Sequence, residues 1–387
     1  MKILIISPST MPTYCGVGKF SDAIAKAFLT ANKEVLVLGK ENQLLTSNLE
    51  VKTQYPVELM NLSFGNTINV IKRIKDYNPD KIIIQFNSAE IGKNFFLSFF
   101  PYFIKLSFIR SKLFSVIHEF NSYTIKGKIR HLVPMFISNQ VLFSDQVNMD
   151  SAMKYLPFKK SEVIKIGPQV GNNFIKPSET QTNIVINNIL NKTKLKIGFH
   201  GLIQPKNNLF VVLDTLKQLN EDKTNFEFHI LGAFKLLFDY GDMNEEVKKY
   251  QESILNKIKE YNLTDKIIIH GDIDPFSLQF QAISKELDIV IFPDQDGTTT
   301  RRTSFWNLFV QSPSVCLVSK SNNEVEDIFD NFVVFDILEE NDLYHEITKL
   351  LNSNSGEIAE LIKKQNMVRL EYSPTSLNKY YNELVEN

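Results

Sequence analysis

Short apolar runs of strand length recur along this chain, and each is followed by a polar turn and a segment with helical spacing. The first run, Lys2–Ser7, is apolar on both faces, as strands buried in parallel sheets are. In the segment that follows, Phe20, Ile24 and Phe28 recur every four residues, which is typical of a helix with one buried face. Glu34–Leu38 is then a second strand. This order predicts a βαβ unit.

The same alternation continues along the chain and predicts an α/β protein with two doubly wound Rossmann-like domains. A stretch rich in Asn, Thr and Lys lies between Gly171 and Leu195 and separates two series of strands. We therefore expect one domain at 1–172, a second at 173–364, and a C-terminal helix at about 365–387 that packs back on the first. The further strands that we expect are 81–86, 113–118, 140–144, 163–166, 195–199, 226–231, 266–270, 288–292, 314–319 and 332–335.

Composition limits the classes of function. The chain has 387 residues, 43% of them hydrophobic and 22% charged, which suits two soluble globular domains. A net charge of −1 without a long basic run gives no electrostatic reason to expect a nucleic-acid partner. Cys15 and Cys316 are distant in sequence, and no metal-ligand spacing is present. With an N-terminal apolar run too short for a secretion signal, we expect a cytoplasmic protein without a metal.

The main candidate for an anion site is a loop between two strands in residues 291–320. It contains Asp296 and the adjacent Arg301 and Arg302, and a short helix follows at Thr303 or Ser304. Guanidinium groups bind phosphates through paired hydrogen bonds, and a helix start presents free N–H groups to anions. Loops at this edge of a parallel sheet commonly bind ligands. We predict a phosphate site, the alternative being a solvated loop with a serine cap.

Polar residues at strand ends of the first half are a second set of candidates. Gln85 ends one strand, and His118 and Glu119 end another, at the edge where ligands bind in such sheets. Gly16 and Gly18 precede the first helix, where a phosphate or a sugar could approach the backbone. The alternatives are a structural histidine and glycines that only turn the chain.

Residues 93–112 are dense in aromatic side chains with scattered basic residues. Pro101 and Lys105 interrupt the apolar run, so we do not expect it to span a bilayer. One interpretation is a surface that lies on an anionic membrane, with the aromatic rings inserted and the basic groups near the headgroups. The other is a core-facing helix pair with a basic outer edge.

Several of these segments together resemble the GT-B glycosyltransferases, especially the retaining family 4. The segment SPSTMPTYCGVGKFSDAIAKAF resembles the first loop of that family, with Cys15 at its first glycine. SVIHEF resembles the strand that ends in His-Asp or His-Glu, and GFHGLIQPKNNLFVVLDTL resembles the start of the second domain. The resemblance implies two domains that face each other across a cleft. It also implies a nucleotide-diphosphate sugar as co-substrate, with no cofactor and no metal.

The resemblance also implies roles for individual residues. Lys206, just before a helix start, matches the family's lysine on the donor diphosphate, and His118 matches the histidine near the transferred sugar. The segments FHILGAF and IIIHGDIDPFSL resemble those around the nucleoside. The residues assigned in this way are Gly232, Gly271, Asp272 and Ile273 for the nucleoside, and Gly16, Gly18, Lys19, Gln85 and Glu119 for the loops around the acceptor and the donor sugar.

One central stretch departs from the family pattern. The family commonly has two glutamates eight positions apart, where this chain has Thr299 and Asn307. The stretch instead resembles a subgroup that reads Asp-Gly-x-x-x-Arg-Arg-x-Ser before the helix. There the arginine pair, with Thr303 and Ser304, takes over phosphate binding, and Asp296 or the loop backbone faces the sugar.

Three hypotheses about function remain open. The first is a transferase that moves a sugar to a glycan or lipid-linked acceptor in cell-surface glycan synthesis, in the cytoplasm or at the inner face of the cell membrane. The second is a nucleotide-sugar epimerase of the same fold. The third is a non-catalytic subunit that binds a partner enzyme. Donor hydrolysis would separate the first from the third, and interconversion of free nucleotide sugars would reveal the second.

Overall fold

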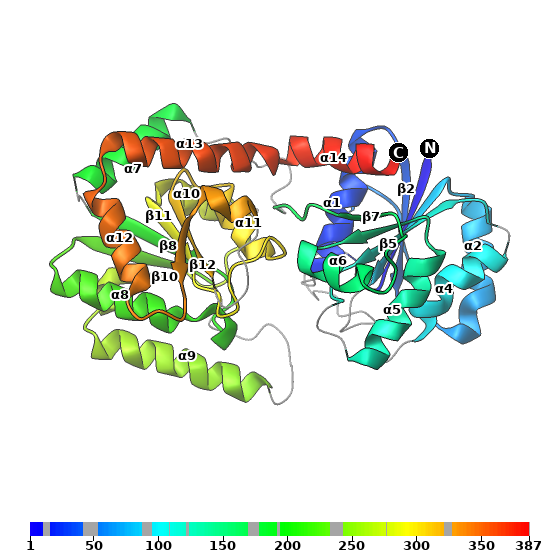
Figure 1. Ribbon diagram of the computed structural model, residues 1–387, viewed down its shortest axis with the longest axis horizontal. Helices are drawn as coiled ribbons and strands as arrows, with labels where there is room; N and C mark the ends of the chain where they lie inside the picture. Colours follow the sequence, from blue (N-terminus) through cyan, green and yellow to red (C-terminus); the bar gives the residue numbers. More distant parts are fainter. Residues whose placement is uncertain are drawn as a thin grey trace. The chain divides into compact units, whose positions relative to one another are not determined.

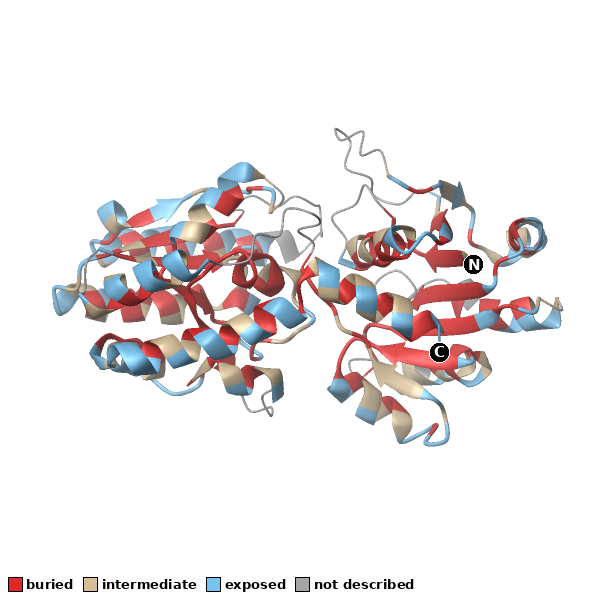
Figure 2. Ribbon diagram, turned by 90° about the horizontal axis from the view of Figure 1, so that it is seen from above, coloured by how far each residue is buried: buried red, intermediate tan, exposed pale blue. Residues whose placement is uncertain are grey.

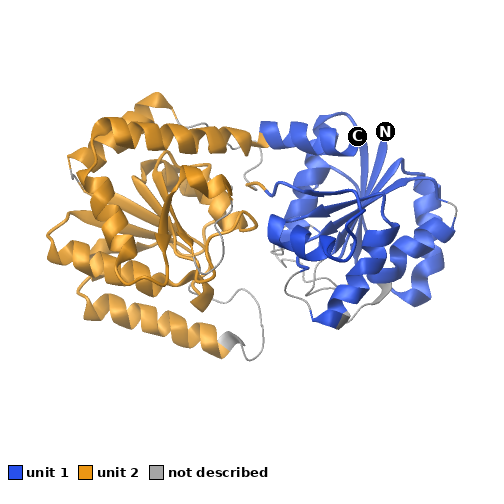
Figure 3. Ribbon diagram, viewed as in Figure 1, with its two compact units in different colours: residues 1–166, 375–387 blue, residues 167–374 orange. Residues whose placement is uncertain are grey.

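The chain folds into two compact α/β units (Figure 3). Unit 1 comprises Met1–Ile166 with Thr375–Asn387, and unit 2 comprises Gly167–Pro374. A computed structural model (Figure 1) describes residues 1–10, 16–41, 53–86, 95–107, 109–120, 124–168, 178–191, 194–232, 243–275, 277–320 and 327–386. Predictions that concern residues 11–15 of the first loop, Lys93, residues 169–177 at the expected domain boundary, and Phe234 lie outside these ranges.

Unit 1 is built on a parallel sheet of seven strands in the order β3-β2-β1-β4-β5-β6-β7. The strand order reverses between β1 and β4, which makes the carboxyl ends of these two strands the topological switch point of the sheet. The strands are β1 (Lys2–Ser7), β2 (Glu34–Lys40), β3 (Val57–Met60), β4 (Lys81–Phe86), β5 (Lys112–Ile117), β6 (Gln140–Phe143) and β7 (Ser161–Val163).

Apolar side chains of this sheet alternate between its two faces. Leu4, Ile6, Leu36 and Leu38 belong to one buried cluster with residues of α2, α4 and α5, whereas α1 and α14 pack together. Asn382 of α14 donates a hydrogen bond to the carbonyl of Ala27 in α1. The helices of the unit are α1 (Gly16–Thr30), α2 (Thr67–Tyr77), α4 (Phe95–Leu106), α5 (Ile125–Ile137), α6 (Gln146–Met153) and α14 (Pro374–Glu386), with a 3-10 turn at Phe64–Asn66.

Unit 2 repeats this plan with a parallel sheet of six strands in the order β10-β9-β8-β11-β12-β13. Here the order reverses between β8 and β11. The strands are β8 (Leu195–His200), β9 (Phe226–Leu231), β10 (Ile267–Ile269), β11 (Ile289–Phe292), β12 (Val315–Lys320) and β13 (Val333–Asp336). The helices are α7 (Glu179–Leu190), α8 (Leu209–Glu221), α9 (Met243–Glu260), α10 (Leu278–Glu286), α11 (Thr303–Phe309), α12 (Asp342–Asn352) and α13 (Ser355–Glu371), with 3-10 turns at Pro205–Asn207, Thr264–Lys266 and Asp327–Asn331.

Burial follows the same pattern in each unit: the inner strands of each sheet are largely buried, the edge strands β3, β7, β10 and β13 are partly exposed, and the helices are buried on the faces that cover the sheets (Figure 2). In unit 2, residues of α7, α8, α9, α12 and α13 share one buried cluster with the sheet. Around α11, the aromatic rings of Phe292, Phe305, Phe309 and Phe332 contact one another. Trp306 stacks on Tyr372 at 4.0 Å between ring centroids. The loop that follows β11 therefore leads into a helix anchored in an aromatic core.

The elements expected from the sequence agree with the structure apart from three local corrections, two in strands and one in a helix. The short edge strand β3 was missed, because its residues are only half-buried and lack a clear alternation. The strand expected at 163–166 lies earlier, at Ser161–Val163. The aromatic stretch forms one helix, α4, with Pro101 inside it rather than a helix pair. None of the described helices is long and apolar enough to cross a bilayer.

Candidate functional site

The loop after β11 lies at the switch point of the unit 2 sheet and is folded tightly on its neighbours. The Thr298 hydroxyl donates to the carbonyl of Phe292 at 2.8 Å, and its N–H donates to the carbonyl of Ser319 at the end of β12 at 2.8 Å. Gly297 has a φ of 85°, a conformation in which glycine avoids strain. Gln295 N–H donates to the carbonyl of Lys206 at 2.8 Å. The loop is thus connected both to β12 and to the turn before α8.

Arg302 is the central charged group of this loop. Its Nη1 lies 2.6 Å from Oδ1 of Asp294 and donates to Oδ1 of Asn207 at 2.8 Å. Within the described part of the chain, its Nε and Nη2 have no partner, and a quarter of the side chain is exposed. A guanidinium anchored through one nitrogen keeps a free edge with two parallel N–H groups, which suits a phosphate.

Asp294, which holds Arg302, is only 3% exposed. Its Oδ2 is buried and has no hydrogen-bond partner among the described residues. Burial raises the pKa of the Asp294 carboxyl to about 6, against the opposing effect of the Arg302 charge. The nearby Asp296 carboxylate raises this pKa further, and the Thr298 hydroxyl lowers it. Buried polar atoms almost always have hydrogen-bond partners. A buried carboxyl oxygen without one is therefore unusual, and it makes this loop a candidate for a functional site.

Lys206 lies in the 3-10 turn Pro205–Asn207 between β8 and α8. Its side chain is exposed, and its ammonium has no partner among the described residues, so it is available to an anion. Asn207, next to it, is buried and donates from Nδ2 to the carbonyl of Leu202 at 2.5 Å while it accepts from Arg302. Asn208 then adopts a left-handed conformation, with a φ of 34°. The structure thus brings the predicted lysine turn and arginine loop together through Asn207.

The other predicted residues of this loop have different surroundings. Asp296 and Arg301 are exposed. Helix α11 begins at Thr303 with Arg302 at the N-cap and no side-chain cap, so neither Thr303 nor Ser304 caps it as expected. Because α11 has only seven residues, its dipole adds little, and the arginine and lysine side chains supply most of the positive charge.

The predicted nucleoside residues follow β9 and β10, which neighbour β8 in the sheet. A Cβ on Gly232 would lie 2.0 Å from the carbonyl oxygen of Gly201, so this glycine is required by the close approach of two backbones. Gly271 has a φ of 77°, and no described atom lies within 4 Å of the place a Cβ would take. Asp272 is exposed and Ile273 is buried.

A pair of stacked histidines precedes the predicted nucleoside residues. His229 Nδ1 lies 3.0 Å from His270 Nε2, and the rings are nearly parallel. Burial and the neighbouring His270 lower the pKa of His229 to about 4. Sequence reasoning did not assign this pair a role, because His229 lies on β9 and His270 follows β10, 41 residues later.

In unit 1, the structure brings together Gln85, His118 and Phe20 from β4, the end of β5, and α1. His118 Nε2 lies 2.8 Å from Oε1 of the fully buried Gln85, and the Phe20 ring contacts the imidazole edge-on at 5.6 Å. The Ser144 hydroxyl donates to the His118 carbonyl at 2.7 Å. His118 is therefore positioned on three sides, and it lies beside the switch point of its own sheet.

The first loop of unit 1 leads into α1 at Gly16. A Cβ on Gly16 would meet nothing within 4 Å, so no described neighbour requires a glycine there. Gly18 is buried, and Lys19 and Glu119 are half-buried. The Ser21 hydroxyl of α1 donates to the Ser7 hydroxyl at the end of β1 at 3.1 Å, which joins the start of the helix to the strand end.

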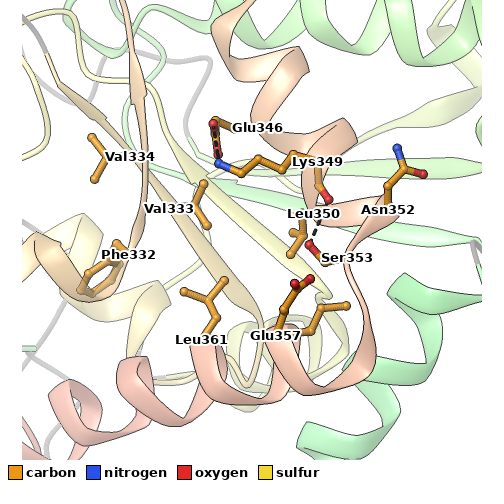
Figure 4. Close-up of a pocket in the computed structure, with 11 residues that line it drawn as sticks. Phe332, Val333, Val334, Glu346, Lys349, Leu350, Asn352, Ser353, Glu357 and Leu361 are labelled. Atoms are coloured by element: carbon orange, nitrogen blue, oxygen red, sulfur yellow. Dashed lines mark hydrogen bonds and ion pairs between the residues drawn. The ribbon is translucent and has the colours of Figure 1, made fainter.

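A separate pocket of about 690 Å³ lies in unit 2 between β13, α12 and α13 (Figure 4). It has an aliphatic floor that includes Val333, Leu350 and Leu361, and the ion pair of Glu346 and Lys349 lies at its rim. None of the predicted site residues lines it. Across the described residues, no group of three or more His, Cys, Asp or Glu side chains could hold a metal ion.

Sequence reasoning missed Asp294 and Asn207 as partners of Arg302. Asp294 directly follows the Phe-Pro pair that ends β11, and an acid at that place is the one sequence signal for it. Asn207 carries no comparable signal, because 95 residues separate it from Arg302.

Two Rossmann-like units in one chain, each built on a parallel sheet, are the architecture of the GT-B fold. Comparison with solved structures shows this fold over the whole chain. HepE from Anabaena, solved in complex with UDP, has a TM-score of 0.71 at 14% identity, with all of both chains covered. A glycosyltransferase from Rickettsia africae has a TM-score of 0.70 at 13% identity, with 100% of this chain and 99% of that one covered. The E. coli trehalose-6-phosphate protein bound with UDP-2-fluoro glucose has a TM-score of 0.69 at 9% identity, covering 99% and 98%.

Sequence comparison is less informative. No protein-family model matches the chain. A probable glucose-6-phosphate isomerase from Methanococcus maripaludis is 23% identical over 154 residues, which are 40% of this chain and 34% of that protein. The chain thus spans about a third of the length of that relative, and the match does not establish a family.

Proposed function

We propose that the protein is a glycosyltransferase that moves a sugar from a nucleotide-diphosphate sugar to a glycan or lipid-linked acceptor in cell-surface glycan synthesis. The observation that carries the proposal is the anchored Arg302 with its free edge, on a loop that is hydrogen-bonded to the turn carrying the exposed Lys206. The solved structures with UDP and UDP-2-fluoro glucose in proteins of this fold support a nucleotide sugar as the ligand class.

The reaction requires the departure of a nucleoside diphosphate from the anomeric carbon. Negative charge grows on the leaving phosphate oxygens in the transition state, and preorganised cationic donors stabilise that charge. Arg302 would bind through Nε and Nη2, and Lys206 and Arg301 would add positive charge, with the N–H groups at Thr303 and Ser304 near the same oxygens. These side chains supply the charge that a metal ion supplies in other transferases, so the proposed reaction needs no metal.

The remaining roles follow the sequence resemblance. Asp296 would face the transferred sugar, and His118, positioned by Gln85, would contact it or position the acceptor. The nucleoside would lie against Gly232, Gly271, Asp272 and Ile273. Gly16, Gly18, Lys19 and Glu119 would shape the acceptor side. We propose that the anomeric configuration is retained, which NMR of the product would test directly.

We further propose that unit 1 rests on an anionic membrane, where a lipid-linked acceptor would be found. Helices α4 and α5 contain no Asp or Glu. Large apolar side chains on them are exposed, among them Tyr102 and Leu106 on α4 and Ile129 and Phe136 on α5. Basic residues on the same helices suit anionic headgroups. Sedimentation with anionic vesicles, compared for the wild type and Ile129→Glu/Phe136→Glu, tests this surface, and equal sedimentation of both would refute it.

The donor site is tested by a thermal-shift panel of nucleoside diphosphates and nucleotide sugars, run on the wild type and on Arg302→Ala. A ligand that binds only the folded state raises its stability, by about 2.7 kcal/mol at a hundredfold excess over its Kd. We expect one nucleotide to stabilise the wild type and not the variant, and the nucleotide that works names the donor class. Stabilisation without any donor hydrolysis or transfer would favour a non-catalytic subunit, and interconversion of free nucleotide sugars would favour an epimerase.

A further inference from the structure

The two oxygens of the buried Asp294 carboxyl have unequal surroundings. Oδ1 forms an ion pair with Arg302 at 2.6 Å, whereas Oδ2 has no partner among the described residues. An ionised carboxylate usually accepts several hydrogen bonds, and a buried one that lacks them is costly. A proton on Oδ2 would remove that cost. The geometry therefore favours the ionised form only as long as the Arg302 charge faces Asp294 alone.

When a donor diphosphate binds to Arg302, the Arg302 charge no longer faces Asp294 alone. Because Arg302 holds Asp294 through Nη1, its free edge would place phosphate oxygens on the far side of the same guanidinium. Two anionic groups would then share one cation in a buried place. A like charge nearby disfavours the ionised form of a carboxyl. The proton would go to Oδ2, because that oxygen has no hydrogen-bond partner among the described residues.

We propose that Asp294 is the internal counter-ion of Arg302, and that Oδ2 takes up one proton from solvent when the donor diphosphate binds to Arg302. This inference rests on the proposed function and deepens it. In this role Asp294 is a positioning residue, because it acts on the ligand through Arg302.

The other charged groups around Asp294 come from each element packed against it. Asp296 on the same loop adds negative charge, and Arg301 lies next to Arg302. Lys206 lies on the turn whose carbonyl accepts from Gln295. Lys320 follows Ser319, whose hydroxyl donates to the Asp294 carbonyl, and it is paired with Asp336. Asp296 strengthens proton uptake and the cations oppose it, and among the described residues Arg302 is the one cation in direct contact with Asp294.

The coupling predicts a definite dependence of affinity on pH. Below the pKa of free Asp294, the carboxyl is already protonated and affinity is constant. As pH rises above about 6, each unit should weaken donor binding by up to tenfold, until the pKa of the complex is reached. Asp294→Asn, which cannot ionise and can still accept from Arg302, should bind with the same affinity from pH 6 to pH 8.

The proton is counted by isothermal titration calorimetry of UDP-glucose at pH 7.5 in HEPES and in Tris, two buffers with different enthalpies of ionisation. UDP itself gains a proton near pH 6, as phosphate monoesters do. UDP-glucose is the cleaner probe, because its diphosphate is esterified at both ends. Asp288→Asn is the matched control: Asp288 is also a buried acid of the β11 segment, but it lies at the opposite end of the strand.

We expect the wild type and Asp288→Asn to show a buffer-dependent enthalpy that corresponds to net proton uptake, and Asp294→Asn to show none. Equal enthalpies in the two buffers for the wild type, or uptake that persists in Asp294→Asn, would overturn the coupling and leave the donor site intact. No binding heat with the wild type at any pH would instead remove UDP-glucose as the donor, and the coupling with it. If Asp294→Asn does not fold, Asp294→Ser serves as the second neutral variant.

Discussion

The two ends of strand β11 each carry a buried aspartate, and the two are satisfied very differently. Asp288, 1% exposed, lies just before the strand. Its Oδ2 accepts from the backbone N–H of Lys196 at 2.9 Å, and its Oδ1 accepts from Nδ2 of Asn188 at 2.8 Å. Asp294, 3% exposed, lies just after the strand with one oxygen on Arg302 and the other unpartnered. Burial raises the pKa of both carboxyls.

This difference separates a structural acid from one that we assign to function. Asp288 joins β8 and α7 to the start of β11, and each of its oxygens accepts a hydrogen bond from a partly buried donor. Asp294 has one acceptor unsatisfied and holds a cation whose Nε and Nη2 have no partner among the described residues. Folding alone would favour an apolar residue or a fully bonded one at that place. The carboxyl ends of parallel strands are where such unsatisfied groups serve ligands.

The largest expected effect comes from removing the cation. Arg302→Ala should weaken nucleotide binding by at least about 100-fold, since a charge-assisted bidentate contact is lost. It should also lower the stability of unit 2 by about 2–3 kcal/mol, because Asp294 is left buried without its partner. Fluorescence of Trp306, the single tryptophan, reports unfolding of this unit. Arg302→Ala/Asp294→Asn should regain most of the stability and none of the binding.

Arg301→Ala is the control for that experiment, since Arg301 is exposed and neighbours Arg302. We expect a smaller loss of binding and little change in stability. Equal losses of nucleotide binding in Arg302→Ala and Arg301→Ala would show that the contacts of Arg302 with Asp294 and Asn207 give it no larger role in binding than Arg301 has.

The next effect concerns Arg369, a buried charged side chain whose three nitrogens each donate a hydrogen bond. Its Nε donates to the carbonyl of Phe309 and its Nη2 to that of Ser314, at 2.9 and 2.7 Å. Burial lowers its pKa to about 10, so it remains charged at neutral pH. Arg369→Met should cost about 3 kcal/mol, because two buried carbonyls lose a charged donor. Urea unfolding followed by Trp306 measures it, and Lys363→Met on the same helix, where the side chain is exposed, should change stability by less than about 0.5 kcal/mol.

The same substitution at the two ends of β11 should act in opposite directions. At pH 8, Asp288→Asn should destabilise unit 2 by about 1–3 kcal/mol, since an amide nitrogen would face a buried donor. Asp294→Asn should stabilise it by about 2 kcal/mol, because the pKa of Asp294 is raised from 3.8 to about 6 and ionisation costs the folded state. A raised pKa stabilises the fold below pH 4, and this contribution is lost as pH rises through 6.

The gain of Asp294→Asn over the wild type should therefore vanish by about pH 4. Unfolding midpoints in urea at pH 4, 6 and 8 measure this dependence. A loss of stability at pH 8, like that expected for Asp288→Asn, would show that both acids are structural.

The smallest effect on stability is expected for Asp296→Asn. Asp296 lies two residues beyond Asp294 but is exposed, so unfolding should change by less than about 0.5 kcal/mol. If Asp296 faces the donor sugar, transfer should fall while the affinity for UDP is nearly unchanged. Initial-rate measurements with UDP-glucose separate kcat from KM, and an unchanged kcat would remove Asp296 from the proposed catalytic residues.

The sequence alone determined most of the fold. Apolar runs such as Lys2–Ser7 and Ile289–Phe292 are buried on both faces, and that pattern requires a parallel sheet with helices on both sides. The sequence pattern did not predict β3, whose four residues lie at a sheet edge, are largely half-buried and show no clear alternation. The sequence also indicated the arginine loop and the lysine turn as candidates for phosphate binding, because their residue types and their places after strands are local features.

Only the tertiary structure decided how these candidates are arranged. The strand order places β8 beside β11, which brings Asn207 to Arg302 across 95 residues. Gly232 looked like a ligand position, and the structure gives it a packing reason in the carbonyl of Gly201. The sequence likewise cannot show that Asp294 Oδ2 has no hydrogen-bond partner among the described residues. That property depends on which side chains from distant segments come near the atom. Local patterns encode elements, whereas burial and pairing between distant segments arise only when the sheet has formed.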